Sequence, residues 1–133
     1  MDHPFLHGVH TDLKQYYMLT EVCQFHKFKA VQTWAFQGGQ PVRIVERTPT
    51  GKFEVTILSN DMEKIISGEH VLEHHTHPEN WIAMELLGEE NSFALLRIFP
   101  DLELEQMLEI VCLTEELNKH LGMDIPEKFK HMI

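Results

Sequence analysis

Cysteine and long apolar runs are both scarce in this sequence. Of 133 residues only two are cysteines, Cys23 and Cys112, and both lie inside apolar segments. Two distant thiols do not make the disulfide framework of a small secreted protein, so we expect buried free thiols in a reducing cytosol. No apolar run exceeds about four residues, far short of a membrane span. The first ten residues, MDHPFLHGVH, lack the basic and apolar regions of a signal peptide. We therefore expect a cytoplasmic protein without membrane contact.

Positive charge is almost missing from the second half of the chain. Residues 60–118 carry fourteen acidic side chains but only two bases, Lys64 and Arg97, and the formal net charge of the whole chain is −10. Nucleic-acid binding depends on clustered Lys and Arg, so direct contact with nucleic acid is not expected. The acidic half instead suits a basic protein partner, or simply a well solvated surface.

The middle of the chain predicts an antiparallel sheet. Three strand-like runs, KAVQTWAFQ, PVRIVERT and KFEVTILS, are separated by GG and PTG, which favour hairpin turns. Phe53, Val55 and Ile57 alternate with polar residues, as in a half-buried strand. We therefore expect a three-stranded β-meander, with SFALLRIF as a further strand.

Helical patterns flank this predicted sheet. The run HTDLKQYYMLTEVCQFHKF is expected to be helical, and DMEKIISG predicts a short helix capped by Asn60 and ended by Gly68. Thr76, Pro78 and Glu79 form a capping-box pattern at the start of THPENWIAMELLGEE, which predicts another helix. The strongest helical pattern is DLELEQMLEIVCLTEELNKHLG near the C-terminus.

This long C-terminal helix would carry two apolar stripes on opposite sides. One stripe contains Ile110 and Leu117, and the other contains Leu104 and Met107. Since a surface helix needs only one apolar face, we expect the second to pack against another subunit in a homodimer. The predicted fold is a single α+β domain over residues 1–133. A three-stranded antiparallel β-meander plus a further strand would be packed by short helices and the long C-terminal helix.

The most unusual stretch is GEHVLEHHTHPENW. Four of the ten histidines of the chain fall there within eight positions, next to a glutamate, and the candidate metal ligands are His70, Glu73, His74, His75 and His77. Imidazole and carboxylate groups at this density suit a divalent metal such as zinc. Without a metal, the same side chains would lie at a solvated junction between two helices, where they could form a pH-sensitive surface. Both alternatives stay open.

Two short strings in this stretch resemble metal motifs of known families. HVLEH resembles the H-x-x-E-H string of the inverted zinc metalloproteases, which implies two histidine ligands and a glutamate base, although those enzymes need a larger domain. HTHP resembles the paired ligands of JAMM-type deubiquitinases and of metallo-β-lactamases. The next ligand positions hold Glu85 and Gly88 for the first family and Glu79 and Asn80 for the second, and these do not match.

The longer string HTHPENWIAMELLGEE is similar to the first cupin motif. His75, His77 and the closing Gly88 have the spacing of that motif, and the resemblance implies metal ligands at both histidines and β-structure around them. The glutamate ligand of the motif would fall at Trp81, and a second cupin motif with its own histidine is not evident. The capping-box interpretation predicts a helix for the same residues, whose composition favours it.

Three further residues are candidates for binding a ligand or a partner. Arg43 and Arg47 alternate with apolar residues on one predicted strand, where they would offer a basic patch to an anion or an acidic partner, or else be solvated. Trp81 would line a groove or fill the core. Cys23 and His26 stand at helical spacing, which is best explained by core packing.

The main functional prediction is a non-catalytic cytoplasmic binding protein that acts through protein–protein contact, as a small chaperone, immunity factor or inhibitor. Its size, acidity, antiparallel sheet and dimer-prone helix are similar to those of class I type III secretion chaperones, a likeness that does not fix function. The first alternative is a small metal-binding protein or metalloenzyme that uses the His/Glu cluster at residues 70–79. The second is a protein that binds or sequesters a small molecule or nucleotide with Arg43, Arg47 and an aromatic side chain.

Overall fold

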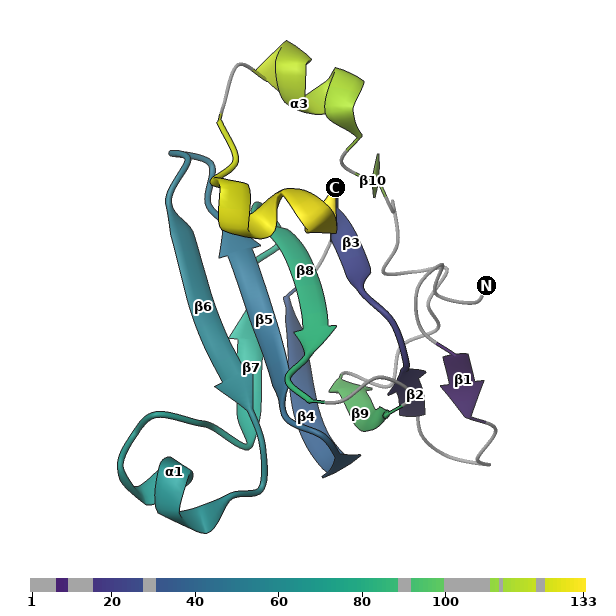
Figure 1. Cartoon of the computed structure of the whole chain (residues 1–133), viewed down its shortest axis with the longest axis vertical. Coiled ribbons are helices and arrows are strands. Elements are labelled where there is room, and N and C mark those ends of the chain that lie inside the picture. The colour runs from purple at the N-terminus through teal and green to yellow at the C-terminus, as the bar shows by residue number, and fades with distance from the viewer. Residues whose placement is uncertain are drawn as a thin grey trace.

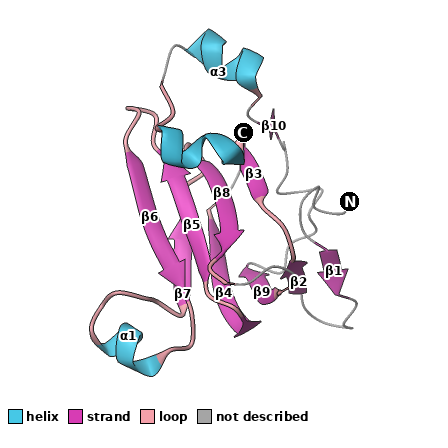
Figure 2. Ribbon diagram, viewed as in Figure 1, coloured by secondary structure: helices cyan, strands magenta, loops and turns pink. Residues whose placement is uncertain are grey.

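The computed structural model describes residues 7–9, 16–27, 31–88, 92–99, 111–112, 114–121 and 124–133. Two five-stranded antiparallel sheets dominate this part of the chain (Figures 1 and 2). The strands of the first sheet are, in spatial order, β1 (His7–Val9), β2 (Tyr16–Leu19), β9 (Ala94–Phe99), β4 (Gln32–Gly39) and β7 (Glu73–Thr76). Those of the second are β10 (Val111–Cys112), β3 (Cys23–Lys27), β8 (Trp81–Leu86), β5 (Val42–Arg47) and β6 (Phe53–Leu58).

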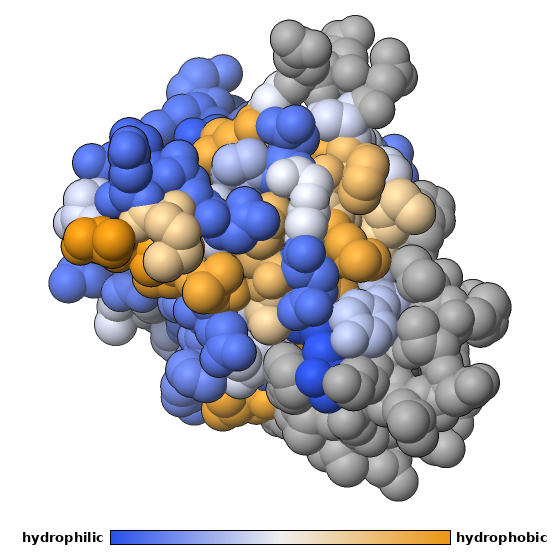
Figure 3. Space-filling model, turned by 90° about the horizontal axis from the view of Figure 1, so that it is seen from below, coloured by the Kyte–Doolittle hydropathy of each residue, from blue (hydrophilic) through white to orange (hydrophobic). Residues whose placement is uncertain are grey.

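The helices of the described chain are short. They are α1 (Met62–Ile66), α3 (Glu115–Leu121) and the 3-10 helix η1 (Glu127–Met132). In Figure 1, α1 lies at the bottom of the sheets, whereas α3 and η1 lie at the top. No helix of the described residues is long and apolar enough to cross a membrane. Figure 3 views the α1 end, where hydrophobic and hydrophilic residues share the surface; Met62 and Ile66 are 61% and 80% exposed.

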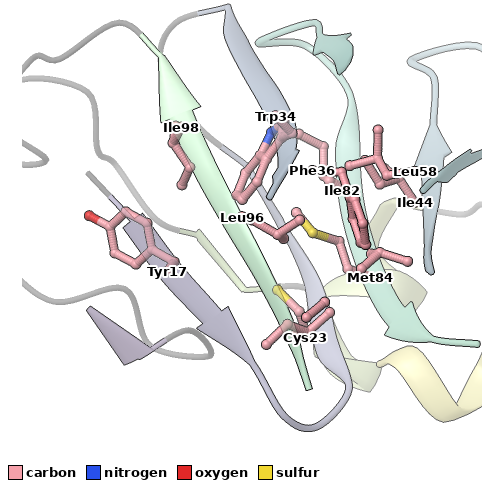
Figure 4. Close-up of a cluster of buried hydrophobic side chains, with 13 residues drawn as sticks. Tyr17, Cys23, Trp34, Phe36, Ile44, Leu58, Ile82, Met84, Leu96 and Ile98 are labelled. Atoms are coloured by element: carbon pink, nitrogen blue, oxygen red, sulfur yellow. The ribbon is translucent and has the colours of Figure 1, made fainter. Parts of the chain in front are cut away.

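The main core fills the space between the two sheets. Strand alternation turns every second side chain inward, so Trp34 of the first sheet and Ile44 of the second are both fully buried. Figure 4 shows Leu96 from the first sheet and Ile82 and Met84 from the second pointing into this same space. Burying one such side chain contributes about 1.5–3 kcal/mol. We call this space the interior.

A second core covers the outer face of the second sheet. Phe25 and Val45 project outward from β3 and β5 and are covered by Phe129 and Met132 of η1. The ring of Phe129 stacks on that of Phe53, with centroids 5.4 Å apart. The C-terminal helix η1 therefore packs on the outer face of the second sheet, opposite to the face that packs on the first sheet.

The predicted α+β fold with a long C-terminal helix is wrong, because the structure is built mainly from antiparallel strands. The strand predictions for β4, β5, β6 and β9 are confirmed, but β4 and β5 belong to different sheets and are not a hairpin. Gly39 between them has φ of 91°, and a Cβ there would clash with the carbonyl oxygen of Phe93. The glycine pair therefore lies where the chain passes from the first sheet to the second, rather than in a hairpin turn. Of the two predicted hairpins, only the one joining β5 and β6 forms.

Two predicted helices are strands. Residues 16–19 and 23–27, expected to be helical, form β2 and β3. The capping-box segment forms the end of β7 and the whole of β8. Thr76 caps no helix: its hydroxyl accepts a hydrogen bond from Trp34 Nε1 at 3.3 Å, while β8 pairs with two neighbouring strands. Sheet pairing between distant segments has overridden a local helical signal.

The prediction of one long C-terminal helix is also wrong. Val111–Cys112 is a strand, and helix is found only at Glu115–Leu121; residues 101–110 lie outside the described part of the chain. The physical reason is that β10 pairs with β3, with Cys112 opposite His26. The homodimer was inferred from the two stripes of that helix, so it stays an untested prediction.

The short helix α1 is confirmed, with a different cap. Asp61 rather than Asn60 is the N-cap, and its Oδ1 accepts the backbone N–H groups of Glu63 and Lys64 at 3.1 and 3.3 Å. Gly68 follows the helix with φ of 84°, as expected for a stop. Cys23 is the buried free thiol that the sequence predicts.

Candidate functional site: a polar cluster in the interior

Polar side chains enter the interior at one end of the second sheet. On β5, Val42 and Ile44 face inward, so Glu46 two residues later faces inward as well. Glu46 stands opposite Ile82 of β8, and Ile82 stands opposite His26 of β3. Glu46, Ile82 and His26 therefore form one row across the inner face. Glu46 is 3% exposed and His26 is fully buried.

The first sheet contributes polar side chains at the same end. Gln32 lies two residues before Trp34 on β4, so its side chain faces the interior as that of Trp34 does. Gln32 pairs with Thr76 of β7. The next pair along is Trp34 with His74. The Thr76 hydroxyl donates to the Gln32 backbone carbonyl at 3.4 Å. Both Gln32 and Thr76 are buried, at 0% and 1% exposure.

One contact joins the two groups of residues. The imidazole Nε2 of His74 lies 3.0 Å from Glu46 Oε2, so a residue of the first sheet is hydrogen-bonded to a residue of the second. We call the combined set the interior polar cluster; its members are His26, Gln32, Glu46, His74 and Thr76. It lies at the end of the sheets opposite α1, since β5 ends there and α1 follows the other end of β6.

The cluster contains buried polar atoms without protein partners. Neither Nε2 nor Oε1 of the Gln32 side chain has a hydrogen-bond partner, and neither does Glu46 Oε1. Leaving a buried donor or acceptor unsatisfied costs about 1–3 kcal/mol per group. In native proteins such groups are hydrogen-bonded to protein, to water or to a bound molecule, so this amide marks a position at which a polar molecule can bind.

His26 is held neutral. Complete burial lowers the pKa of His26 to about 4, an effect that the hydrogen bond to the backbone of Gln24 partly opposes. The contact between His26 Nδ1 and the Gln24 carbonyl oxygen is 2.7 Å, so Nδ1 carries the proton and donates it. Cys23 Sγ lies 3.6 Å from the same nitrogen.

The predicted metal ligands are distributed over several environments. His74 faces inward, whereas Glu73 and His75, its neighbours on β7, face outward. His75 Nδ1 is 2.6 Å from Thr33 Oγ1, and exposed His77 accepts the backbone N–H of Glu79 at 3.3 Å. His70 Nδ1 lies 2.7 Å from Ser59 Oγ. Within the described ranges, no three His, Cys, Asp or Glu residues are grouped so that they could hold a metal ion.

The other three candidates lie on the outer face of the second sheet. Arg43 pairs with Glu85. Arg47 is fully buried and donates from one terminal nitrogen to Asn118 Oδ1 at 2.8 Å. Trp81 is 5% exposed within the second core, with Lys27 Nζ 4.9 Å from its ring centroid. The structure does not bring these residues to the interior polar cluster.

Sequence reasoning missed Gln32 and Glu46, although a signal was there. Gln32 shares the phase of Trp34 in its strand, and Glu46 shares the phase of Val42 and Ile44. A polar residue on the apolar face of a strand breaks the pattern expected of a core, and natural proteins show such breaks mainly at functional sites. His26 was identified but assigned to core packing alone.

Comparison with known proteins identifies a family and a shared fold. A family model described as "Cupin superfamily (DUF985)" matches residues 14–107. Protein SO0799 from Shewanella oneidensis is similar in structure, with a TM-score of 0.62 and 17% identity over 90% of this chain and 81% of that one. A hypothetical protein from Leishmania major has a TM-score of 0.60 and 11% identity over 91% and 85%. At these identities the two structures show the fold alone. No curated protein matches.

These findings correct the main functional prediction. We predicted a non-catalytic protein that acts through protein–protein contact, and the family match does not support this prediction. Members of the cupin superfamily are commonly enzymes or binders of metals and small molecules. The apolar stripes, which were one part of the expected contact surface, were assigned to a continuous helix that the strand Val111–Cys112 interrupts.

Proposed function

The chain belongs to the cupin superfamily, in the family DUF985, and on this basis we propose that it binds a small polar molecule in the interior polar cluster. The observation that carries the proposal is the Gln32 side chain, which is fully buried with both amide atoms unpartnered. An amide presents donors and an acceptor side by side, so one ligand group can satisfy both atoms together.

Glu46 and His74 support this assignment. Glu46 Oε2 is fixed by His74, which leaves Oε1 buried and ready to accept a hydrogen bond from a ligand. The contact also orients the carboxylate from across the interior. Oriented polar groups among apolar side chains are typical of small-molecule sites.

A metal ion of the kind that many cupins hold does not fit the described interior. The row that faces the first sheet is Glu46, Ile82 and His26, and its middle position has no ligand atom. Gln32 offers a neutral amide rather than a carboxylate, and one of the two carboxylate oxygens of Glu46 is hydrogen-bonded to His74. The proposal therefore rests on hydrogen bonding by the side chains of the chain itself.

The test is a fragment screen with matched variants. Small polar fragments are added to the purified protein, and binding is followed by ligand-observed NMR and by the shift in melting temperature. Fragments that bind the interior should lose binding in Gln32→Leu but keep it in Gln37→Leu, because Gln37 is exposed on the same strand. Fragments that bind both variants equally, or no binding at all, would exclude the interior polar cluster as the site.

A further inference from the structure

Charge inside the described interior is one-sided. Lys27 lies over Trp81 in the second core, and Arg43 and Arg47 project from the outer face of the second sheet. Arg97 of β9 alternates with inward-facing neighbours and so lies on the outer face of the first sheet. No lysine or arginine of the described strands therefore faces the interior polar cluster.

The remaining groups add no net positive charge. Burial keeps His26 neutral at neutral pH, with a pKa of about 4. His74 is hydrogen-bonded to Glu46. Since the negative charge of a carboxylate cancels any positive charge on the imidazole, the pair adds no net positive charge. An anionic ligand would have to give up its hydration next to a buried carboxylate oxygen, and no lysine or arginine of the described strands is placed to compensate that cost.

The hydrogen-bonding atoms point to the kind of group that fits instead. Glu46 Oε1 can only accept when ionised, so the ligand must donate to it. The Gln32 amide both donates and accepts, so a carboxamide, which carries an N–H beside an acceptor oxygen, can satisfy both of its atoms. A protonated amidine carries only N–H donors, so it can donate to Gln32 Oε1 and to Glu46 Oε1.

We propose that the interior polar cluster is selective for ligands bearing an N–H-rich, non-anionic group, of the carboxamide or amidine class, and rejects the matching carboxylates. This inference rests on the proposed function and adds the charge and hydrogen-bonding class of the ligand. Selectivity comes from the unpartnered atoms of Gln32 and Glu46, together with the outward placement of the lysine and arginine side chains on the described strands.

Two matched fragment series test the inference at two sizes: acetamide, acetamidine and acetate, and benzamide, benzamidine and benzoate. Each fragment is titrated against ¹⁵N-labelled protein, and the side-chain NH₂ resonances of Gln32 are followed. We expect the amide or the amidine of at least one series to shift these resonances, and the carboxylate to bind at least about tenfold more weakly.

The variant Glu46→Gln distinguishes a cationic natural ligand from a neutral one, since both kinds can donate N–H groups to the cluster. If the natural ligand is cationic, amidine binding should fall about tenfold while amide binding changes little, because only the amidine gains from the negative charge. A neutral ligand predicts that the amide is already the stronger binder in the unmodified protein. Either result supports the inference.

The two proposals fail in different ways. Carboxylates that shift the Gln32 resonances as strongly as amides would overturn the inference while leaving an interior site intact. If no fragment of either series moves those resonances, both the inference and the proposed interior site are wrong. Gln37→Leu serves as the control that keeps all binding, since Gln37 is exposed.

Discussion

Glu46 and His74 are 28 residues apart in sequence, lie in different sheets, and meet through a 3.0 Å contact between Oε2 and Nε2. The carboxylate is almost completely buried, and its second oxygen has no partner. This contact fixes one wall of the interior polar cluster. Its consequences for stability and for ligand binding can be measured separately.

Removing one partner of this pair should destabilise the protein more than removing both. His74→Ala leaves Glu46 buried without a donor, and we expect the free energy of unfolding to fall by about 2 kcal/mol. The double variant Glu46→Leu/His74→Leu should recover most of this loss, because no buried charge remains. Urea unfolding measures all three proteins. His75→Ala, on the outward face of β7, is the control and should change stability by less than about 0.5 kcal/mol.

Gln32→Leu should make the ligand-free protein more stable. The substitution removes two unsatisfied buried atoms and adds an apolar side chain of similar size to the main core, so the free energy of unfolding should rise by about 1–3 kcal/mol. Thermal and urea unfolding provide the measurement. Loss of stability in this variant would mean that the amide is already satisfied within the protein, and the case for a ligand there would be lost.

Stability should depend on pH through His26. The pKa is 6.5 for an ordinary histidine and about 4 for buried His26. In this window the unfolded chain binds a proton that the folded chain does not. Stability is therefore fully present above pH 6.5 and falls as the pH drops toward 4, by up to about 3 kcal/mol.

The pH dependence is tested by urea unfolding at several pH values. In His26→Asn the slope between pH 6.5 and 4 should become shallower than in the unmodified protein, whatever the absolute stability of the variant. His75→Asn, at an exposed position, should retain the slope. An unchanged slope in His26→Asn would show that other groups cause the acid sensitivity.

The His/Glu stretch should not hold a stoichiometric metal. Because β7 turns Glu73 and His75 away from His74, these side chains do not converge in the described structure. Elemental analysis of protein purified without an affinity tag should find well below one equivalent of zinc, iron or manganese. A full equivalent that disappears in His74→Ala/His77→Ala would instead support the metalloprotein alternative.

Strand patterns were the most predictable part of the fold. The strand-like runs PVRIVERT and KFEVTILS and the apolar run SFALLRIF correctly located β5, β6 and β9. The segment around Thr76 misled because its capping-box pattern is local, whereas the pairing of β8 with β3 and β5 depends on residues far away in sequence. The same local pattern favoured a helix over the β-structure that the cupin-like string HTHPENWIAMELLGEE implies, and the structure has a strand there.

The candidate site was less accessible from sequence. The density of histidines drew the prediction to residues 70–79, but the interior polar cluster is formed by residues of four strands, and of its members only His74 and Thr76 lie in that stretch. Gln32 and Glu46 could have been found from their phase alone. The contact between Glu46 and His74 depends on how the two sheets pack together, which no local pattern encodes.

The most direct test of the account is a crystal structure of the protein with the strongest interior-binding fragment. We predict that a donor or acceptor of the fragment lies within about 3.2 Å of Gln32 Nε2 or Oε1, between the two sheets. A structure in which the Gln32 amide is hydrogen-bonded only to the protein, with the fragment elsewhere, would contradict the central claim.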